Sequence, residues 1–71
     1  MEINLTYKGY SQIKDRDLED IAKSFNGSKA GSGFMIPTQE RDISFNFPSQ
    51  EDADKFVAFV TRKWKDIKVT F

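Results

Sequence analysis

An alternation of apolar and polar residues in the second half of the chain constrains the fold more than any other sequence feature. In residues 42–47, read as Asp-Ile-Ser-Phe-Asn-Phe, the apolar side chains occupy every second position. Successive side chains of a β-strand point to opposite faces of its sheet, so this spacing gives one buried face and one wet face. The segment therefore predicts a central strand whose two phenylalanines face the core.

Three further segments carry strand patterns of their own. Residues 2–7 repeat the alternation, and 34–36 form a short apolar run that ends at Pro37. Residues 66–71 alternate again, so we expect the side chain of Phe71 to face inward. The turn at 37–41 should join the second and third strands as a hairpin.

Two segments carry the spacing of amphipathic helices. The first is predicted to start near Asp15 and to end at Asn26-Gly27, with Gly27 in a left-handed conformation after its last turn. The second should start at Ser49, an N-cap residue with Asp52 three positions on. The apolar stripes of the two helices comprise Leu18, Ile21, Ala22 and Phe25 in the first, and Ala53, Phe56, Val57, Val60 and Trp64 in the second.

The order of these elements is β-α-β-β-α-β, which predicts one α+β domain over residues 1–71 with the ferredoxin-like sandwich. In this topology a four-stranded antiparallel sheet is covered on one face by two antiparallel helices. The first and third strands should be central, and they carry the two clearest alternations.

Composition argues against several classes of function. The 71 residues include no Cys and no His, so we expect no disulfide, no metal site, no cofactor and no enzymatic activity. Eleven basic and eleven acidic residues cancel, which disfavours a dedicated binder of duplex nucleic acid. The chain has neither a long apolar run nor a basic start before an apolar segment, so we expect a cytoplasmic protein that does not bind membranes.

The stretch from Ser28 to Gly33 (Ser-Lys-Ala-Gly-Ser-Gly) is the one low-complexity segment, and we expect it to be a flexible connector without a ligand. A phosphate-binding loop would need Lys directly after its last Gly, but Phe34 stands there. The outward positions of the central strands carry no aromatic side chain. Stacking of RNA bases on the sheet is therefore disfavoured.

One end of the predicted sandwich gathers three connections, at residues 8–14, 37–41 and 65–66. They should form a mildly basic rim that carries Lys8, Tyr10, Arg41 and Lys63. Phe59 lies off the apolar stripe of the second helix and is a second candidate anchor for a partner. We expect Tyr10 and Arg41 to be replaceable without loss of stability, because loops can vary without disturbing a core.

The best functional hypothesis is a small protein-binding module, an adaptor or inhibitor of the compact kind that bacteria and phages encode. It would be a monomer or a weak homodimer with another protein as its partner. One alternative is a nucleic-acid-binding module that uses the basic rim. Another is a self-associating structural domain joined through edge strands.

Overall fold

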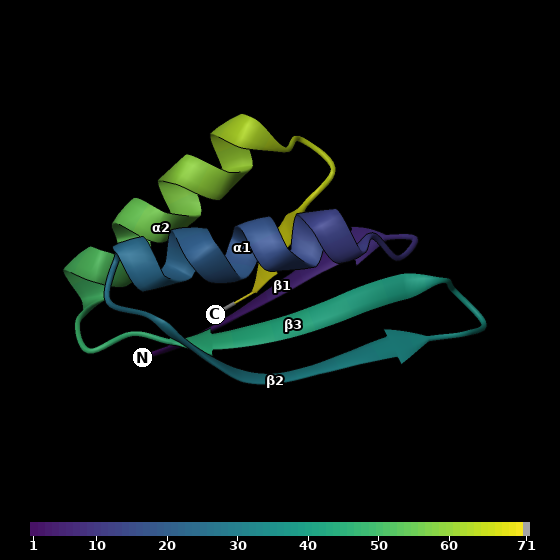
Figure 1. Cartoon of the computed structure of the whole chain (residues 1–71), viewed down its shortest axis with the longest axis horizontal. Helices are drawn as coiled ribbons and strands as arrows, with labels where there is room; N and C mark the ends of the chain where they lie inside the picture. The colour runs from purple at the N-terminus through teal and green to yellow at the C-terminus, as the bar shows by residue number, and fades with distance from the viewer. Residues whose placement is uncertain (71) are drawn as a thin grey trace.

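A computed structural model describes residues 1–70 of the chain, and its element order is β-α-β-β-α-β (Figure 1). The predicted fold class, an α+β sandwich of ferredoxin-like topology, is confirmed. The elements are β1 (Glu2–Lys8), α1 (Gln12–Ser24), β2 (Ser28–Met35), β3 (Glu40–Asn46), α2 (Gln50–Lys63) and β4 (Lys68–Thr70).

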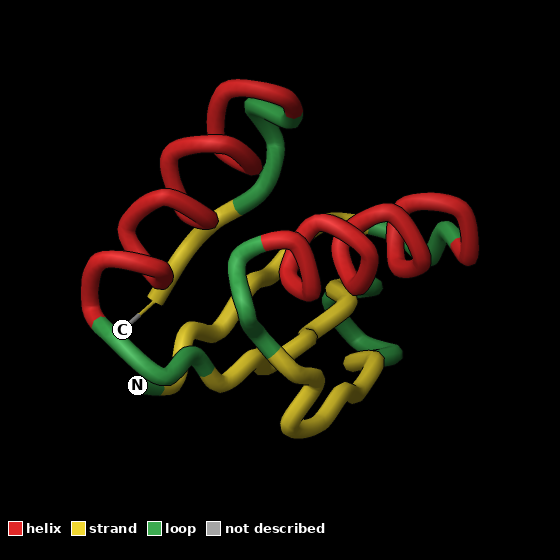
Figure 2. Tube along the Cα trace, turned by 60° about the vertical axis from the view of Figure 1, so that its left-hand side comes forward, coloured by secondary structure: helices red, strands yellow, loops and turns green. Residues whose placement is uncertain are grey.

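The four strands form one antiparallel sheet in the order β2-β3-β1-β4, so β1 and β3 are central as predicted. Ile3 lies opposite Phe45, and Leu5 lies opposite Ile43. Both helices lie on one side of the sheet and run in opposite directions (Figures 1 and 2). An Asn26 amide 3.5 Å from Asp52 marks where the end of α1 meets the start of α2.

The core lies between the sheet and the helices. The alternating residues of β1 and β3 are buried there, and Phe56 of α2 contacts both Phe45 and Phe47 at ring-centroid distances of 5.4 Å and 4.9 Å. The buried hydrophobic residues are Ile3, Leu5, Tyr7, Leu18, Ala22, Ile43, Phe45, Phe47, Ala53, Phe56, Val60 and Ile67. The predicted register of the central strands is therefore confirmed.

Helix α1 differs from its prediction at both ends. It begins at Gln12, before Asp15, because the Ser11 hydroxyl caps it by accepting from the Lys14 N–H at 3.2 Å. The left-handed residue at its end is Asn26, with φ of 66°, and Gly27 does not adopt positive φ. Gly27 is required for space instead, since a Cβ there would overlap the ring of Phe47.

The prediction that Ser28 to Gly33 is a flexible connector is wrong. These residues form most of β2, an edge strand that pairs with β3 from Ser28 opposite Asn46 to Met35 opposite Glu40. The register shifts between Lys29 and Gly31, so Ala30 forms a bulge. An edge strand needs few side-chain contacts, because backbone hydrogen bonds to its one neighbour hold it.

Three other boundaries move by a few residues. The hairpin turn occupies Ile36 to Gln39, and Gln39 has φ of 56°. Strand β3 therefore begins at Glu40 and stops before the buried Phe47. Strand β4 is only Lys68–Thr70, although Ile67 before it is buried as predicted. The predicted inward position of Phe71 falls outside the described residues.

The cap of α2 is confirmed, since the Ser49 hydroxyl accepts from the Asp52 N–H at 3.2 Å. Trp64 follows the last helical residue and packs against the core while remaining partly exposed. Both helices thus begin at serine caps, and each places an acidic residue in its first turn, where the helix dipole favours negative charge.

The buried face of β3 generates the first prediction. Phe45→Ala should lower the free energy of unfolding by about 3–5 kcal/mol, because it leaves a cavity against Phe56. Asn46→Ala, on the exposed face, should change it by less than about 0.5 kcal/mol. Urea titrations of the two variants measure this difference, and equal midpoint shifts would contradict the register.

Candidate functional site

The three connections predicted to converge do meet at one end of the sandwich. The Gly9 N–H donates to the Gln39 carbonyl at 2.6 Å, which joins the β1–α1 connection to the hairpin turn. Lys14 forms an ion pair with Asp66 at 3.0 Å, which joins the start of α1 to the segment before β4. A hollow of about 580 Å³ at this end is lined by residues of all three connections, among them Lys8, Pro37 and Asp66.

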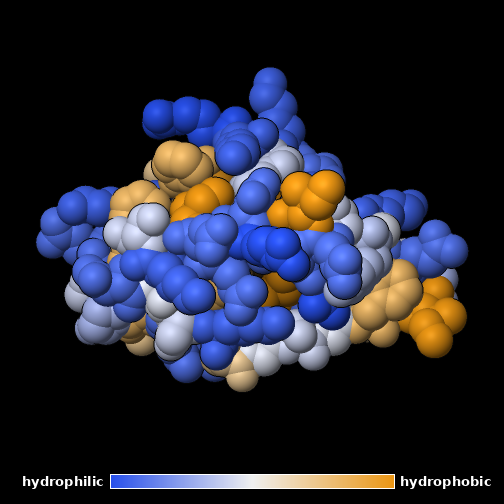
Figure 3. Space-filling model, in the orientation of Figure 1, coloured by the Kyte–Doolittle hydropathy of each residue, from blue (hydrophilic) through white to orange (hydrophobic). Residues whose placement is uncertain are grey.

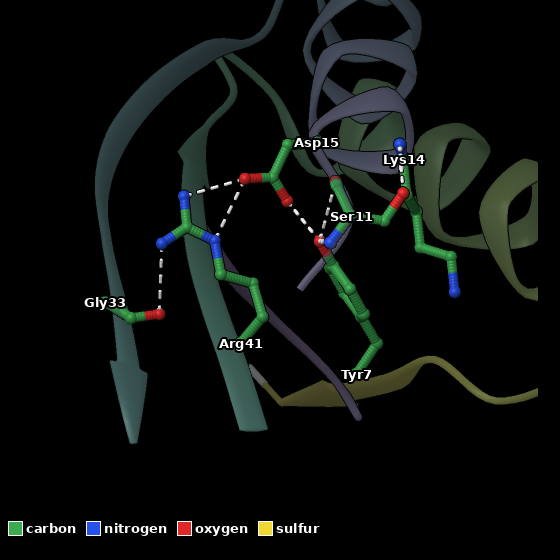
Figure 4. Close-up of polar contacts among 6 residues, drawn as sticks. All are labelled: Tyr7, Ser11, Lys14, Asp15, Gly33 and Arg41. Atoms are coloured by element: carbon green, nitrogen blue, oxygen red, sulfur yellow. Dashed lines mark hydrogen bonds and ion pairs between the residues drawn. The ribbon is translucent and has the colours of Figure 1, made fainter. Parts of the chain in front are cut away.

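A carboxylate holds this end of the molecule together. Asp15 of α1 accepts from two nitrogens of Arg41 on β3, at 2.7 Å and 3.0 Å, and from the hydroxyl of Tyr7 on β1 (Figure 4). The side chains of Arg41 and Asp15 are only 12% and 15% exposed. A third guanidinium nitrogen donates to the Gly33 carbonyl at 3.3 Å, so Arg41 also contacts β2.

This geometry changes the expectation for Arg41. The residue was expected to be a free cation on a rim, replaceable without loss of stability. The structure instead places it in a largely buried ion pair with a charge-assisted fork of hydrogen bonds. Its removal would leave the Asp15 carboxylate without a counter-charge.

The environment of Tyr7 shifts its ionisation. Burial and the hydrogen bond to Asp15 raise the pKa of Tyr7 to about 12, because both disfavour a phenolate beside a carboxylate. The Ser11 N–H lies within reach of the same hydroxyl at 3.4 Å. Tyr7 is thus a neutral hydrogen-bond donor at physiological pH, and through Asp15 it ties β1 to α1.

Several of the exposed residues at this end are aromatic or apolar. The ring of Tyr10, 54% exposed, lies 4.8 Å from the guanidinium carbon of Arg41 and 6.2 Å from the ring of Phe34, edge to face. Phe34, Met35 and Ile36 are 42%, 47% and 78% exposed. Figure 3 shows apolar atoms at this end, over the turn between β2 and β3.

We call the free side of β2 together with Tyr10, Phe34, Met35 and Ile36 the edge surface. Strand β2 pairs only with β3, so its other side carries no neighbouring strand within residues 1–70 (Figure 2). A Cβ added at Gly31 or Gly33 would meet open space, so no other part of the chain packs over the faces of the strand at these two positions. Sequence reasoning missed this surface because it treated most of β2 as a linker.

The remaining candidate residues do not join this group through a contact in the described part of the chain. Lys8 is exposed opposite Glu40 on the open face of the sheet. The ammonium of Lys63 lies 4.8 Å from the ring centre of Trp64. Phe59 is 46% exposed, and its ring lies 6.1 Å from that of Phe25, between the helices.

The expected basic rim is weaker than the sequence indicated. Arg41 and Lys14 are neutralised by Asp15 and Asp66, respectively. The open face of the sheet is polar and mixed in charge, with Ser44 donating to Asn4 at 3.0 Å and Thr6 donating to Asp42 at 3.3 Å. The two lysines that line the hollow, Lys8 and Lys68, share it with Glu40 and Asp66, so the field that phosphate groups would meet there is mixed in sign.

The described residues contain no cluster of His, Cys, Asp or Glu suited to a metal ion. Within residues 1–70, neither helix has the length and apolar content required to cross a bilayer. Comparisons with protein-family models, curated proteins and solved structures found no match.

The raised pKa of Tyr7 generates a prediction about pH. The folded value of about 12 exceeds the unfolded value of about 10, so the neutral hydroxyl stabilises the fold fully below pH 10 and loses that effect as the pH rises toward 12. In a Tyr10→Phe variant, Tyr7 is the remaining tyrosine, and its ultraviolet absorbance should titrate near 12. The same variant in urea should titrate near 10, and equal midpoints would contradict the buried hydrogen bond.

The ion pair between Arg41 and Asp15 generates a prediction about stability. Loss of one member of a buried ion pair costs about 3–5 kcal/mol, and Arg41→Ala should lower the free energy of unfolding by nearly that amount. Lys8→Ala, at an exposed position, is the control and should change stability by less than about 0.5 kcal/mol. Urea titration measures both, and a stable Arg41→Ala protein would show that Asp15 does not need its partner.

Proposed function

We propose that this chain is a small non-enzymatic protein-binding module, of the adaptor or inhibitor kind, and that it binds its partner through the edge surface. The observation that carries the proposal is the coincidence of an uncovered strand with exposed aromatic and apolar side chains at its end. Edge strands offer backbone hydrogen bonds to a partner, and adjacent side-chain pockets or anchors add specificity.

The composition of the edge surface supports a protein as the partner. Tyr10 and Phe34 are large side chains held in place by each other and by Arg41, so little conformational entropy would be lost when they bind. Aromatic residues and Met are enriched in protein interfaces and dominate their energetics. Strand β2 contains a single charged residue, Lys29, so little charge has to be desolvated.

A nucleic acid is a weaker candidate for this surface. Binding to a phosphate backbone depends on unpaired Lys and Arg side chains. Arg41, the cation closest to Tyr10, is already paired with Asp15. Phe59 is a weaker candidate site than the edge surface, because its exposed ring packs against Phe25 and no free backbone accompanies it.

The test of this proposal compares two sets of exposed aromatic or apolar residues. Phe34→Ser combined with Ile36→Ser should abolish capture of partner proteins from an extract of the source cell, because it removes the anchors beside β2. Phe59→Ser is the matched control, since Phe59 is exposed to a similar degree, and it should leave capture unchanged. Quantitative mass spectrometry of the captured proteins measures the difference.

Urea titration of both variants checks that the fold persists. Proteins that the wild type captures and the Phe34→Ser/Ile36→Ser variant loses would support the proposal. Loss of the same proteins with Phe59→Ser alone would move the site to the helical layer and overturn it. Equal capture by all three proteins would also overturn it.

A further inference from the structure

The regular part of β2 has the properties of a strand that can pair with itself. After the bulge at Ala30, residues 31–35 read Gly-Ser-Gly-Phe-Met and contain no charge. Small residues occupy the first half of this segment and large apolar residues the second. An antiparallel pair of identical strands sets the first half of one against the second half of the other.

The register that matches these halves is centred on Gly33. In that register Gly33 lies opposite Gly33 of a second copy, each Phe34 lies opposite a Ser32, and each Met35 lies opposite a Gly31. Because opposite residues of an antiparallel pair project to the same face, every large side chain gains space above a small one. A Cβ at Gly31 or Gly33 would meet open space, so the volume beside these glycines is not already filled by another part of the same chain.

The charges of the chain agree with this arrangement. Lys29 lies outside residues 31–35, so the two copies of its ammonium would stand at opposite ends of the paired segment. The chain as a whole has a net charge of zero, so two copies do not repel each other over long distances. The side chain of Tyr10 would then cover Phe34 at the junction, as it already does within one chain.

We infer that the edge surface is occupied by a second copy of this chain, through antiparallel pairing of β2 with β2 centred on Gly33. The inference rests on the proposed function, because it names a partner for the same surface. The paired segment is short, so the homodimer is weak and exchanges with monomer. A different protein that binds the edge surface would compete with it.

The first measurement is the mass of the purified chain across concentration. Sedimentation equilibrium from about 10 μM to about 1 mM should show a rise from the monomer mass of 8.2 kDa toward twice that value. A mass that stays at 8.2 kDa throughout would overturn the inference. It would leave the proposed function standing if capture of another protein still depended on Phe34 and Ile36.

The second measurement tests whether the contact between the two copies is at Gly33, by placing a charge there. Gly33 lies opposite Asp42 within one chain, so Gly33→Glu would line up four carboxylates across the junction of two copies. The dissociation constant should rise about tenfold or more, since like charges directly opposite each other destabilise a strand pair. Gly33→Ala is the neutral control and should change the constant by less than about threefold, because a Cβ at this position meets open space.

A mixture of two variants tests whether Gly33 of one copy lies opposite Gly33 of the other. Equal amounts of Gly33→Glu and Gly33→Lys should form a mixed dimer that is tighter than the dimer of Gly33→Glu alone, because opposite charges then lie directly across from each other at the centre of the strand pair. Native mass spectrometry distinguishes the mixed species. Dimerisation of Gly33→Glu at the wild-type level, or no preference for the mixed species, would overturn the assignment to β2.

Discussion

The contacts of the Asp15 carboxylate connect the interior of the fold to its exposed end. A carboxylate with so little exposure is costly unless it is paired, and here Arg41 supplies the charge and Tyr7 a further hydrogen bond. The three side chains come from α1, β3 and β1, so one group ties the first helix to both central strands. Arg41 in turn positions Tyr10, and Tyr10 packs on Phe34.

The sequence predicted the parts of the fold whose pattern is set by burial. The alternations in β1 and β3 and the serine cap of α2 are local signals, and they were read correctly because a one-residue shift would expose every core side chain of a strand. The convergence of three connections followed from the topology alone. It was confirmed by the contacts between Gly9 and Gln39 and between Lys14 and Asp66.

What the sequence did not predict depends on partners that are distant in the chain. Strand β2 has almost no side-chain signal, because backbone pairing to β3 is what makes it a strand. The pairing of Arg41 with Asp15 joins residues 26 positions apart, so charge counting treated both as surface groups. Gly27 was assigned to a turn, although it is needed where Phe47 approaches the backbone.

The two edges of the sheet are unequal, and this has a consequence for how large an assembly can become. Strand β2 offers eight residues at one edge, whereas β4 offers three at the other. A chain with two long free edges can add neighbours on both sides and grow into a filament. Within the described residues β4 gives an incoming strand little to pair with, so an assembly built through β2 would have one long edge per chain to use and would close at two copies.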